Sequence, residues 1–517
     1  MRDIDICNKY YTITMVTVSL TMLMTSFFHG SYSLPIESCP MFGCRPSGTF
    51  SYDLDIRSNV SMAWPKPFKQ SSFPDSLGCV GNEELIVCQG DGQTNRGYVS
   101  LNVENGSLAW SDRVLHHPTL PIMDIYGDIV GTDGSKLVKY EVDGTLEKPV
   151  INDNVSPVYS ITFSDNNILA IVSKRGSLVT VESNGIPHAY MEFRGWEERM
   201  NGTFIPIAPP VVAGHRIYIL TAFRPDQEKK ELSMQRLYAV DIFNVLSGKL
   251  KIAWYFNFER LAKAKSNKRT GDKAISVQPQ ILINTDTNTL FVNLPPVQST
   301  GEATHVVWGF KDDLKSSAPT LLFKTPQPVS ELALYESSKS VPVNNRTDFL
   351  HNPWQHFQGV FGPRLSTDPD KATLWAVSTE KELILKLSPL DGSVLQLIRL
   401  NILFNMTTTV TSRLMVARTK SSPEDVLIFG IEVTPTRNGV VSEAFIDICR
   451  SHSVNPNLKY YVVCLRDAIV NWIIDTPSEC PVVGQITGIK TSDNNKPDML
   501  VVTTNSPDKS EIFALNV

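Results

Sequence analysis

The sequence lacks the features expected of a nucleic-acid-binding protein, a helical repeat protein or a serine hydrolase. Its 48 Lys and Arg residues nearly balance 53 Asp and Glu residues, so the net charge is only −5 and nucleic acid is not expected as a partner. No G-x-S-x-G motif and no phosphate-binding glycine loop is present. Apolar residues rarely recur with a helical period. At 42% hydrophobic residues, the 517-residue chain still has enough apolar material for a large core.

The N-terminal residues have the order of a secretory signal. Arg2 and Lys9 precede an apolar run at 11–28, and small residues follow up to a cleavage position after Ser33. We expect residues 1–33 to be a cleaved signal peptide and residues 34–517 to be secreted or to stay in the secretory-pathway lumen. An uncleaved signal anchor, giving a type II membrane protein, is the alternative. No other stretch is long and apolar enough to span a bilayer.

Cysteine is absent from the middle of the chain. Apart from Cys7, four cysteines lie near the start of the expected mature chain and three near its end: Cys39, Cys44, Cys79, Cys88, Cys449, Cys464 and Cys480. An oxidising compartment makes all seven disulfide candidates. Cys79 and Cys88 flank a hairpin-like segment, Cys449 and Cys464 bracket a loop, and Cys480 is expected to tie the two ends together by pairing with Cys39 or Cys44. The odd number leaves one cysteine free or bonded to another chain.

Six N-x-S/T sequons are candidate glycosylation sites in such a compartment: Asn59, Asn105, Asn154, Asn201, Asn345 and Asn405. Their use would make the protein a secreted glycoprotein. They are compatible with secretion but do not establish it, because a chain rich in Asn, Ser and Thr contains such sequons by chance.

A five-residue pattern recurs along the chain, with apolar residues at its first, third and fifth positions. This alternation is typical of a half-buried β-strand. The best copies are 52–56 (YDLDI), 99–103 (VSLNV), 138–142 (VKYEV), 238–242 (YAVDI) and 513–517 (FALNV), and weaker copies are 179–183, 306–310, 385–389, 427–431 and 461–465.

Each copy belongs to a larger unit. Most copies follow another apolar strand and run into a glycine-centred turn, where positive φ is needed, and then into a further strand that often ends in tryptophan. The spacing of about 40 to 60 residues predicts one four-stranded propeller blade for each unit.

Three segments carry a resemblance to a known repeat: 98–110 (YVSLNVENGSLAW), 238–254 (YAVDIFNVLSGKLKIAW) and 385–396 (LKLSPLDGSVLQ). They resemble the repeat of the pyrroloquinoline-quinone-type propellers, the quinoprotein alcohol dehydrogenase-like superfamily. The resemblance implies an all-β fold, with a single β-propeller of four-stranded blades over most of residues 47–517. The chain contains eight to ten copies, and the family implies eight blades.

The two ends of the chain are expected to share one blade. The segment FALNV ends the chain part-way through a unit, and YDLDIRSNVSMAW begins the expected mature chain at the same point. Such closure removes exposed sheet edges, and the terminal cysteines would reinforce the seam. In the resembled family, tryptophans such as Trp64, Trp110 and Trp254 pack between neighbouring blades.

Enzymes of the resembled family hold pyrroloquinoline quinone at the propeller centre over a calcium ion, with an aspartate as general base. Many also place a vicinal disulfide against the quinone. This sequence has no Cys-Cys pair, and no set of Glu, Asn and Asp matches the family's positions. We therefore assign no catalytic, cofactor-binding or metal-binding residue, and neither the quinone nor calcium is expected as a cofactor.

Long connections interrupt the repeats at 223–236, 260–273 and 326–358, and we expect binding surface there. His351 and His356 in the last connection could supply metal ligands together with Asp348, although a solvated loop is the favoured interpretation. The basic cluster at 263–269 is likewise interpreted as a solvated loop rather than as a site for an anionic partner.

These observations favour a secreted or secretory-pathway propeller that acts as a non-catalytic scaffold for a protein or glycan partner. One alternative is a diverged quinone-dependent dehydrogenase, and another is a hydrolase or lyase built on the propeller. A hydrolase or lyase needs carboxylates or histidines clustered at the funnel mouth, whereas a binding module needs an apolar or aromatic patch. A membrane is a partner only if the N-terminal segment stays uncleaved.

Overall fold

The computed structural model describes most of the chain after residue 37. The residues outside the description are 1–37, 71–76, 91–96, 113, 116–117, 124–126, 135, 147–149, 152–156, 164–167, 182–186, 198, 227–233, 243–248, 259–278, 295–296, 300–301, 305–306, 326–328, 336–337, 341–363, 367–371, 419–423, 436–439, 478, 492, 494 and 507–509. Pro35–Val517 is one compact unit, and the expected signal segment belongs to another, Met1–Leu34. No helix of the described residues is long and apolar enough to cross a membrane.

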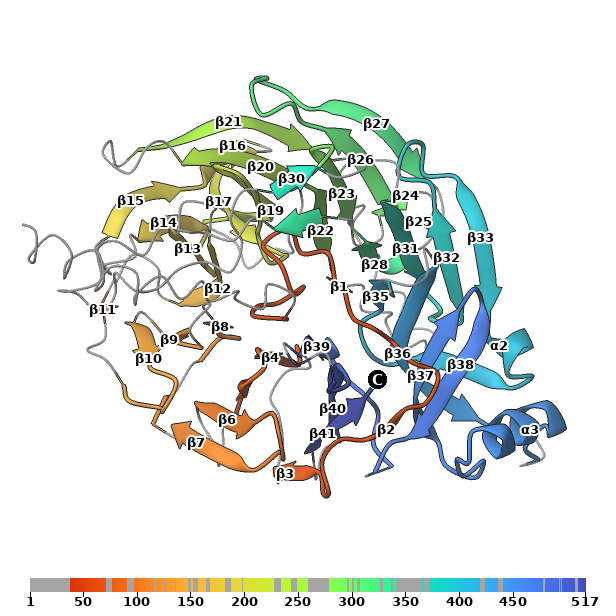
Figure 1. Ribbon diagram of the computed structural model, residues 1–517. Helices are drawn as coiled ribbons and strands as arrows, with labels where there is room; N and C mark the ends of the chain where they lie inside the picture. Colours follow the sequence, from red (N-terminus) through yellow and green to blue (C-terminus); the bar gives the residue numbers. More distant parts are fainter. Residues whose placement is uncertain are drawn as a thin grey trace, which may run out of the picture. The chain divides into compact units, whose positions relative to one another are not determined.

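Eight sheets of mainly antiparallel strands form a ring, so the fold is an eight-bladed β-propeller, as the resemblance implied (Figure 1). In most blades the strands follow chain order from the centre of the ring to its rim. The apolar faces of each blade must be covered by its neighbours. A closed ring gives every one of the eight blades a neighbour on each side.

The first four blades follow one another along the chain, and blade 4 is enlarged by a hairpin. Blade 1 contains β4 (Cys79–Gly81), β5 (Leu85–Gln89), β6 (Tyr98–Asn102) and β7 (Leu108–Asp112). Blade 2 contains β8 (Ile122–Met123), β9 (Ile129–Asp133), β10 (Lys136–Tyr140) and β11 (Val150–Ile151). Blade 3 contains β12 (Val158–Phe163), β13 (Leu169–Ser173), β14 (Ser177–Val181) and β15 (Pro187–Glu192). Blade 4 contains β18 (Val211–Ala213), β19 (Arg216–Pro225), β20 (Gln235–Ile242), β21 (Leu250–Asn257) and the hairpin β16 (Arg194–Glu197) and β17 (Met200–Pro206).

The last four blades include strands from both ends of the chain. Blade 5 contains β22 (Gln280–Asn284), β23 (Thr289–Asn293), β26 (Val307–Lys311) and β27 (Thr320–Thr325), with the hairpin β24 (Val297–Ser299) and β25 (Glu302–Thr304) in its middle connection. Blade 6 contains β28 (Val329–Tyr335), β31 (Thr373–Ser378), β32 (Leu383–Leu387) and β33 (Val394–Arg399), and its added hairpin is β29 (Ser338–Ser340) and β30 (Arg364–Ser366). Blade 7 contains β1 (Ser51–Tyr52), β34 (Thr407–Val410), β35 (Met415–Arg418), β36 (Asp425–Thr434), β37 (Tyr460–Arg466) and β38 (Ile469–Asp475), with α2 (Leu400–Leu403) before it and α3 (Glu443–Ser451) inside it. Blade 8 contains β39 (Thr487–Ile489), β40 (Met499–Asn505), β41 (Ser510–Asn516), β2 (Ser61–Met62) and β3 (Phe68–Gln70).

The recurring five-residue pattern marks the third strand of every blade. Eight of the ten predicted copies overlap these third strands, which are β6, β10, β14, β20, β26, β32, β37 and β41. The third strand is flanked by strands on both sides and faces both neighbouring blades, so its apolar residues are needed in every repeat.

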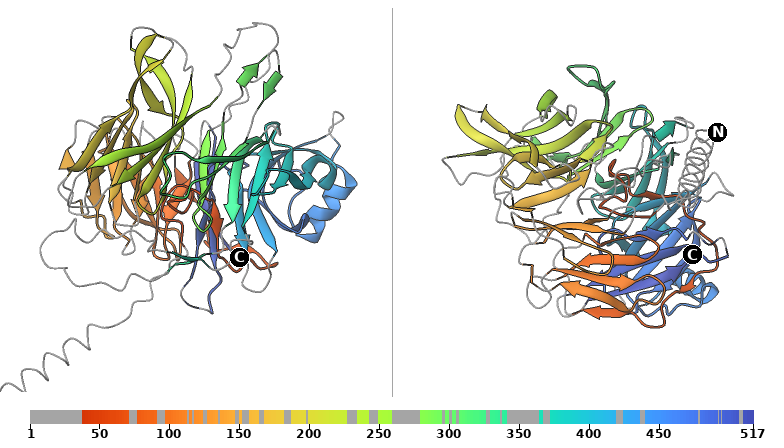
Figure 2. Two further views of the ribbon diagram at one scale, coloured as in Figure 1. Left: turned by 90° about the horizontal axis from the view of Figure 1, so that it is seen from above. Right: turned by 60° about the vertical axis from the view of Figure 1, so that its left-hand side comes forward.

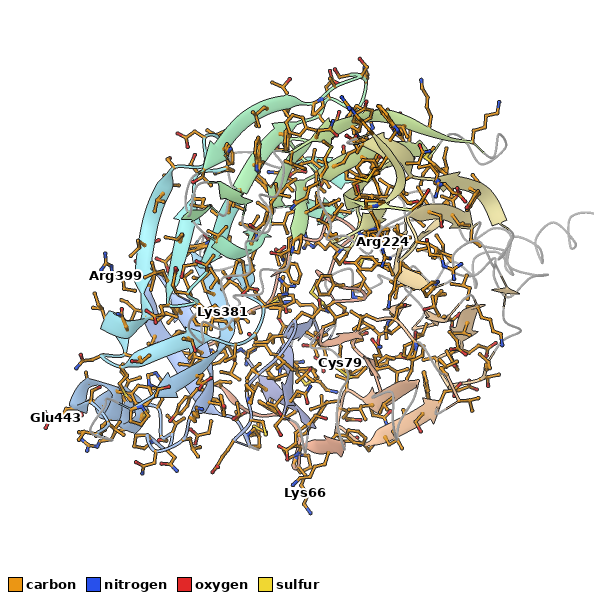
Figure 3. The ribbon with its side chains drawn as sticks, turned by 180° about the vertical axis from the view of Figure 1, so that it is seen from behind. Lys66, Cys79, Arg224, Lys381, Arg399 and Glu443 are labelled. Atoms are coloured by element: carbon orange, nitrogen blue, oxygen red, sulfur yellow. A yellow bond between two sulfur atoms is a disulfide. The ribbon has the colours of Figure 1, made fainter. Side chains whose placement is uncertain are left out.

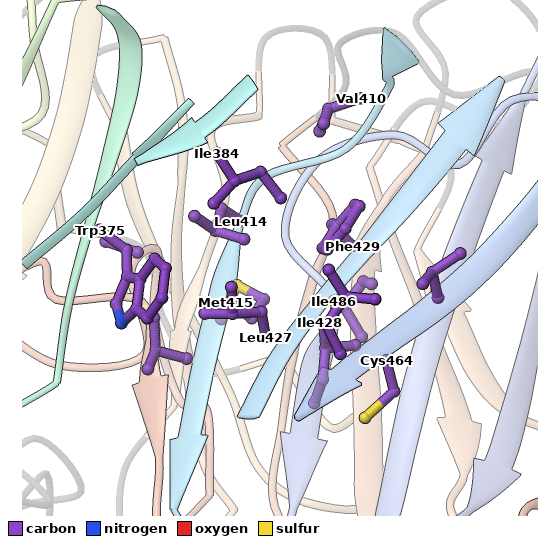
Figure 4. Close-up of a cluster of buried hydrophobic side chains, with 14 of the residues drawn as sticks. Trp375, Ile384, Val410, Leu414, Met415, Leu427, Ile428, Phe429, Cys464 and Ile486 are labelled. Carbon is purple, nitrogen blue, oxygen red and sulfur yellow. The ribbon is translucent and has the colours of Figure 1, made fainter. Parts of the chain in front are cut away.

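Two copies of the pattern do not lie in third strands. The copy at 427–431 lies in β36, the second strand of blade 7, whose residues are buried on both faces (Figure 4). The copy at 52–56 forms only the end of β1, which pairs in parallel with β35 near the ring centre. Tyr52 and Leu54 are buried against Gly488 of β39. The apolar residues of this copy therefore alternate because they are buried between blades 7 and 8, and not because they belong to a third strand.

The ring is closed by strands from both ends of the chain, as predicted. Both β2 and β3 pair antiparallel with β41, the last strand. The predicted disulfide across this seam is wrong, because Cys39 is bonded to Cys44. The second disulfide, Cys79–Cys88, joins β4 to β5 as predicted, and Cys79 lies near the ring centre (Figure 3).

Cys449 and Cys464, the other predicted pair, are two separate buried thiols. Cys449 lies on α3 and Cys464 on β37. Burial in apolar surroundings raises the pKa of both thiols to about 12. Such thiols remain protonated at neutral pH and are poor nucleophiles.

Tryptophans pack between blades, as the resemblance implied, and they explain the glycines of the repeat. Trp64 packs on the turn glycine Gly106 of blade 1, and Trp110 packs on Gly144 of blade 2. A Cβ atom on these glycines would lie 2.4 and 2.5 Å from the indole rings. Each indole N–H also donates to a backbone carbonyl of the same neighbouring blade, at 2.6 and 3.1 Å. Trp254 is buried and contacts blade 5.

We expect Gly144→Ala to destabilise the fold more than Gly134→Ala. Both glycines follow an aspartate in a turn of blade 2 and have positive φ, +87° and +63°. Nothing lies within 4 Å of a Cβ on Gly134, so that change should cost only the backbone penalty of about 1 kcal/mol. The clash with Trp110 should raise the cost at Gly144 to about 2–4 kcal/mol. Denaturant unfolding of both variants gives the comparison. Equal midpoints would mean that the contact of Trp110 with Gly144 does not contribute to stability as expected.

Two of the predicted long connections contain blade strands. The segment 223–236 includes the ends of β19 and β20, which extend with the hairpin β16–β17 beyond one face of the ring (Figure 2). The segment 326–358 includes β28, the innermost strand of blade 6. The sequence predicted both segments as long connections, and the structure corrects their bounds, because parts of β19, β20 and β28 lie within them. The segment 260–273 lies outside the described residues.

Candidate functional site

The centre of the ring is filled by the residues that precede the first blade. We call residues 38–50 the central segment; nearly all of them are buried, and the segment runs inside the ring of inner strands (Figure 1). Backbone N–H groups of six blades donate to its carbonyl oxygens at 2.8–3.1 Å: Gly81 to Cys39, Met123 to Pro40, Val212 to Pro46, Ile283 to Ser47, Leu334 to Thr49 and Val416 to Phe50. Met41 belongs to a buried apolar cluster that also contains Val158 and Ile161 of blade 3.

The central segment is held in a compact coil by its own turns. The N–H of Cys44 donates to the carbonyl of Met41 at 2.9 Å, and the N–H of Phe50 donates to the carbonyl of Gly43, also at 2.9 Å. Gly43 has a φ of +75°, and a Cβ on it would lie 2.8 Å from the Cα of Gly48. Glycine is therefore required at this position, where two parts of the backbone cross.

Gln485 of blade 8 is the main side-chain contact of the central segment. Its side chain is fully buried, and its Oε1 accepts a 2.8 Å hydrogen bond from the Gly43 N–H. Its Nε2 donates to the carbonyls of Met41 at 3.2 Å and Cys79 at 2.8 Å, and lies 3.4 Å from the Cys39 sulfur. One amide side chain thus connects the central segment to blades 1 and 8.

A charged group anchors the segment where it leaves the centre. Arg45 donates to Asp53 at 3.1 Å, and the Tyr335 hydroxyl of blade 6 donates to the other Asp53 oxygen at 2.7 Å. Burial, reinforced by the Asp53 charge, raises the pKa of Tyr335 far above its usual value, so this hydroxyl remains a donor at any physiological pH.

A pocket of about 400 Å³ lies beside the central segment. Phe42 of the segment forms one wall, and the other walls come from residues that lead into or begin the inner strands of blades 1 to 5, and from Arg413, which precedes β35 of blade 7. Most of the lining is apolar, and its polar side chains include Tyr159, Gln280 and Arg413. A pocket of this size and composition is typical of sites for small organic ligands.

Arg413 and Glu331 form a buried ion pair at this pocket. The guanidinium nitrogen lies 3.5 Å from the Glu331 carboxylate, and the side chains are 11% and 7% exposed. Burial raises the pKa of Glu331, partly offset by Arg413, and burial lowers the pKa of Arg413, partly offset by Glu331. The guanidinium also lies 5.7 Å from the ring centres of Phe42 and Phe50, so it contacts the central segment.

The centre of this ring does not fit the quinone and calcium of the resembled enzymes. Backbone of the central segment occupies the centre of the ring, where the resemblance implies that the quinone would be held. Calcium needs several oxygen ligands, commonly carboxylates, and the described residues contain no group of three His, Cys, Asp or Glu side chains placed to hold a metal ion. Glu331, the carboxylate nearest to Arg413 of the pocket lining, is already paired with that arginine.

The structure places four of the six sequon asparagines on the surface: Asn59, Asn105, Asn201 and Asn405 are exposed. Asn154 and Asn345 lie outside the described residues, as do Asp348, His351, His356 and the basic cluster at 263–269. Cys480 is buried and is not bonded to Cys39 or Cys44, which are bonded to each other. Among the sequence-predicted site residues that the structure describes, only the two disulfide pairs are brought together.

The comparisons with known proteins concern the fold. No family model matches the chain, and no curated protein matches its sequence. A quinohemoprotein alcohol dehydrogenase from Pseudomonas putida HK5 superimposes with a TM-score of 0.43 and 7% identity, covering 93% of this chain and 80% of that chain. BamB from Moraxella catarrhalis superimposes with a TM-score of 0.41 and 11% identity, covering 88% of this chain and 99% of that chain. The C-terminal WD40 domain of Sif2 superimposes with a TM-score of 0.43 and 9% identity, covering 89% of this chain and 99% of that chain. At these TM-scores and identities the likenesses carry no argument about function. The propeller fold is assigned from the eight sheets of the structure itself.

Proposed function

We propose that this chain is a diverged pyrroloquinoline-quinone-type propeller that acts, in the secretory pathway or outside the cell, as a non-catalytic scaffold for a protein or glycan partner. The observation that carries this proposal is the central segment. It fills the centre of the ring with backbone that is hydrogen-bonded to six blades, where the resembled enzymes need an open cofactor site. A propeller without that site retains its rigid outer surfaces, on which partners can bind.

The cysteines and sequons support the proposed location. Disulfides persist in oxidising compartments, and the described residues contain two of them. Every sequon asparagine within the described residues is exposed, as attachment of a glycan requires.

The enlarged blade 4 supports a partner-binding role. Its hairpin exposes Trp196, which is 64% accessible, and Tyr255 of β21 is 54% accessible. Tyr190 of β15, a strand that lies against β21, is 45% accessible. Exposed aromatic side chains are enriched at protein interfaces and also stack on sugar rings. We therefore place the binding surface on blades 3 and 4.

The first test is a titration of the secreted protein with pyrroloquinoline quinone and calcium. We expect no saturable change in the quinone absorbance and no rise in the melting temperature, because the central segment occupies the ring centre and the pocket of about 400 Å³ beside it suits a smaller molecule. Saturable binding with a stabilised fold would overturn the non-catalytic assignment and support the dehydrogenase alternative.

The second test concerns the partner. Cross-linking and glycan-array binding of the wild-type protein should identify a partner whose binding falls at least tenfold in Trp196→Ala. Leu390→Ala is the control, because Leu390 is also an exposed apolar residue, 80% accessible, and lies between β32 and β33 of blade 6. A partner that binds Trp196→Ala and the wild type equally would place the surface elsewhere.

A further inference from the structure

We infer that the pocket beside the central segment binds a small carboxylic acid with an apolar body. This inference goes beyond the scaffold role and does not depend on it, because it concerns a ligand of a few atoms inside the ring rather than a partner on blades 3 and 4. It follows from the pocket's donors, its single cationic side chain and its apolar walls.

The walls define a ligand with an apolar body. Leu120 and Ile122 of blade 2, Ile161 of blade 3 and Ile207 before blade 4 line the pocket together with Phe42 of the central segment. A volume of about 400 Å³ suits a molecule of roughly ten to twenty non-hydrogen atoms. An aliphatic chain or a single aromatic ring would remove these walls from water and gain the corresponding hydrophobic free energy.

Gln280 supplies a donor that lacks an acceptor. Its side chain lines the pocket and is only 3% exposed. Oε1 accepts a 2.8 Å hydrogen bond from the Leu332 N–H, and this bond fixes which end of the amide carries the donors. Nε2 has no hydrogen-bond partner among the described residues. A buried amide N–H without a hydrogen-bond acceptor lowers the stability of the folded protein, so a ligand that supplies an acceptor in the pocket would be stabilising.

Arg413 supplies the positive charge. Arg413 lines the pocket, its guanidinium has five N–H donors, and one of its nitrogens lies 3.5 Å from the Glu331 carboxylate. Tyr159 also lines the pocket, and burial raises the pKa of its hydroxyl to about 12, so it stays a donor at neutral pH. An amide N–H, a guanidinium and a phenol favour an acceptor that carries negative charge.

Other ligand classes fit less well. A cation would be repelled by Arg413, and a sugar would place many hydroxyl donors against walls that offer few acceptors. A planar quinone with calcium would need the carboxylate ligands that the described residues do not bring together. A carboxylate on an apolar body would accept a hydrogen bond from Gln280 Nε2 on the side of the pocket that Arg413 lines, and its apolar body would cover the apolar walls.

The test uses two pairs of probes of matched shape and different charge. Phenylacetate and hexanoate are titrated into the secreted full-length protein and followed by calorimetry and melting temperature, with phenylacetamide and hexanamide as the neutral counterparts. We expect saturable binding of at least one acid, with its amide at least tenfold weaker. Equal binding of an acid and its amide, or no binding of either acid to the folded protein, would overturn the inference.

Variants show whether the binding occurs in this pocket. Gln280→Glu keeps the acceptor for Leu332 and replaces the Nε2 donor by a carboxylate oxygen, so acid binding should fall at least tenfold. Gln235→Glu is the matched control, because Gln235 is also buried, also lacks side-chain partners among the described residues and does not line the pocket. If Gln280→Glu does not fold, Ile207→Trp fills the pocket with an apolar side chain and should abolish binding. Acid binding that survives in these variants would rule out this pocket.

Discussion

Replacing Arg216 by methionine is expected to lower the free energy of unfolding by about 3–5 kcal/mol. Arg216 is 1% exposed and lies between blades 4 and 5. It donates to Asp241 at 2.6 and 3.1 Å and to both oxygens of Asp312 at 2.8 Å. The substitution leaves two carboxylates without their cation in a site that is largely closed to water.

Asp312 makes this cluster unusually dependent on the arginine. Its side chain is fully buried, and it also accepts from the Tyr218 hydroxyl at 2.9 Å and from the Trp254 indole at 3.0 Å. The repeat tryptophan of blade 4 is therefore attached to blade 5 through a charge that only Arg216 neutralises within this cluster. Loss of the arginine should weaken the contact between the two blades as well as the ion pair.

The matched control is Arg194→Met in the hairpin of blade 4. Arg194 also pairs with an aspartate, Asp226, at 2.7 Å, but its side chain is 55% exposed. Exposed pairs contribute little, so this variant should lose less than about 1 kcal/mol. Urea denaturation of both variants gives the comparison, and similar losses would mean that burial of the Arg216 cluster does not determine its contribution.

Gln485→Leu is the second change with a large expected effect. Leucine has a similar size but cannot accept from the Gly43 N–H or donate to the carbonyls of Met41 and Cys79. The Gly43 N–H would be left buried without an acceptor, and we expect a loss of about 2–4 kcal/mol. Hydrogen exchange should increase within residues 38–50 before it increases in the blades, because the lost contacts hold the central segment.

A glutamine with a single contact provides the comparison for Gln485. Gln89 is partly buried and donates one 2.8 Å hydrogen bond to the carbonyl of Pro118. Gln89→Leu should therefore cost about 1 kcal/mol and leave the exchange of residues 38–50 unchanged. If Gln485→Leu behaves in the same way, the central segment is held mainly by its backbone hydrogen bonds to the blades.

The ring could be predicted from the sequence because its third strands share one environment. Strands such as β6 and β20 lie between two other strands, so the same alternation and the same turn glycine recur. The closing blade could be predicted as well, since FALNV ends one strand before its unit is complete. The ambiguity between eight and ten units arose at β1 and β36, where burial between elements produces similar apolar spacing.

The candidate site could not be predicted from the sequence. Residues 38–50 (SCPMFGCRPSGTF) have no period, because each residue contacts a different blade and no two environments are alike. Gln280, Arg413 and Glu331 are each separated from the others by more than 50 positions and come together only because blades 5, 6 and 7 converge at the centre. A lone glutamine or arginine before a strand gives no signal of its own.

The central segment also constrains the order in which the protein can be completed. Its residues are synthesised before any blade, yet the Gly43 N–H donates a hydrogen bond to Gln485, 442 positions later. Likewise, β2 and β3 can pair only after β41 has been synthesised. Contacts between such distant residues form slowly, and until blade 8 emerges the outer strand of an open ring can pair with other chains. A chain that stops before blade 8 loses the closing pairs and the Gln485 contacts together. If the secretory pathway retains such a shortened chain, the retention would depend on whether the whole ring is complete and not on damage to one blade.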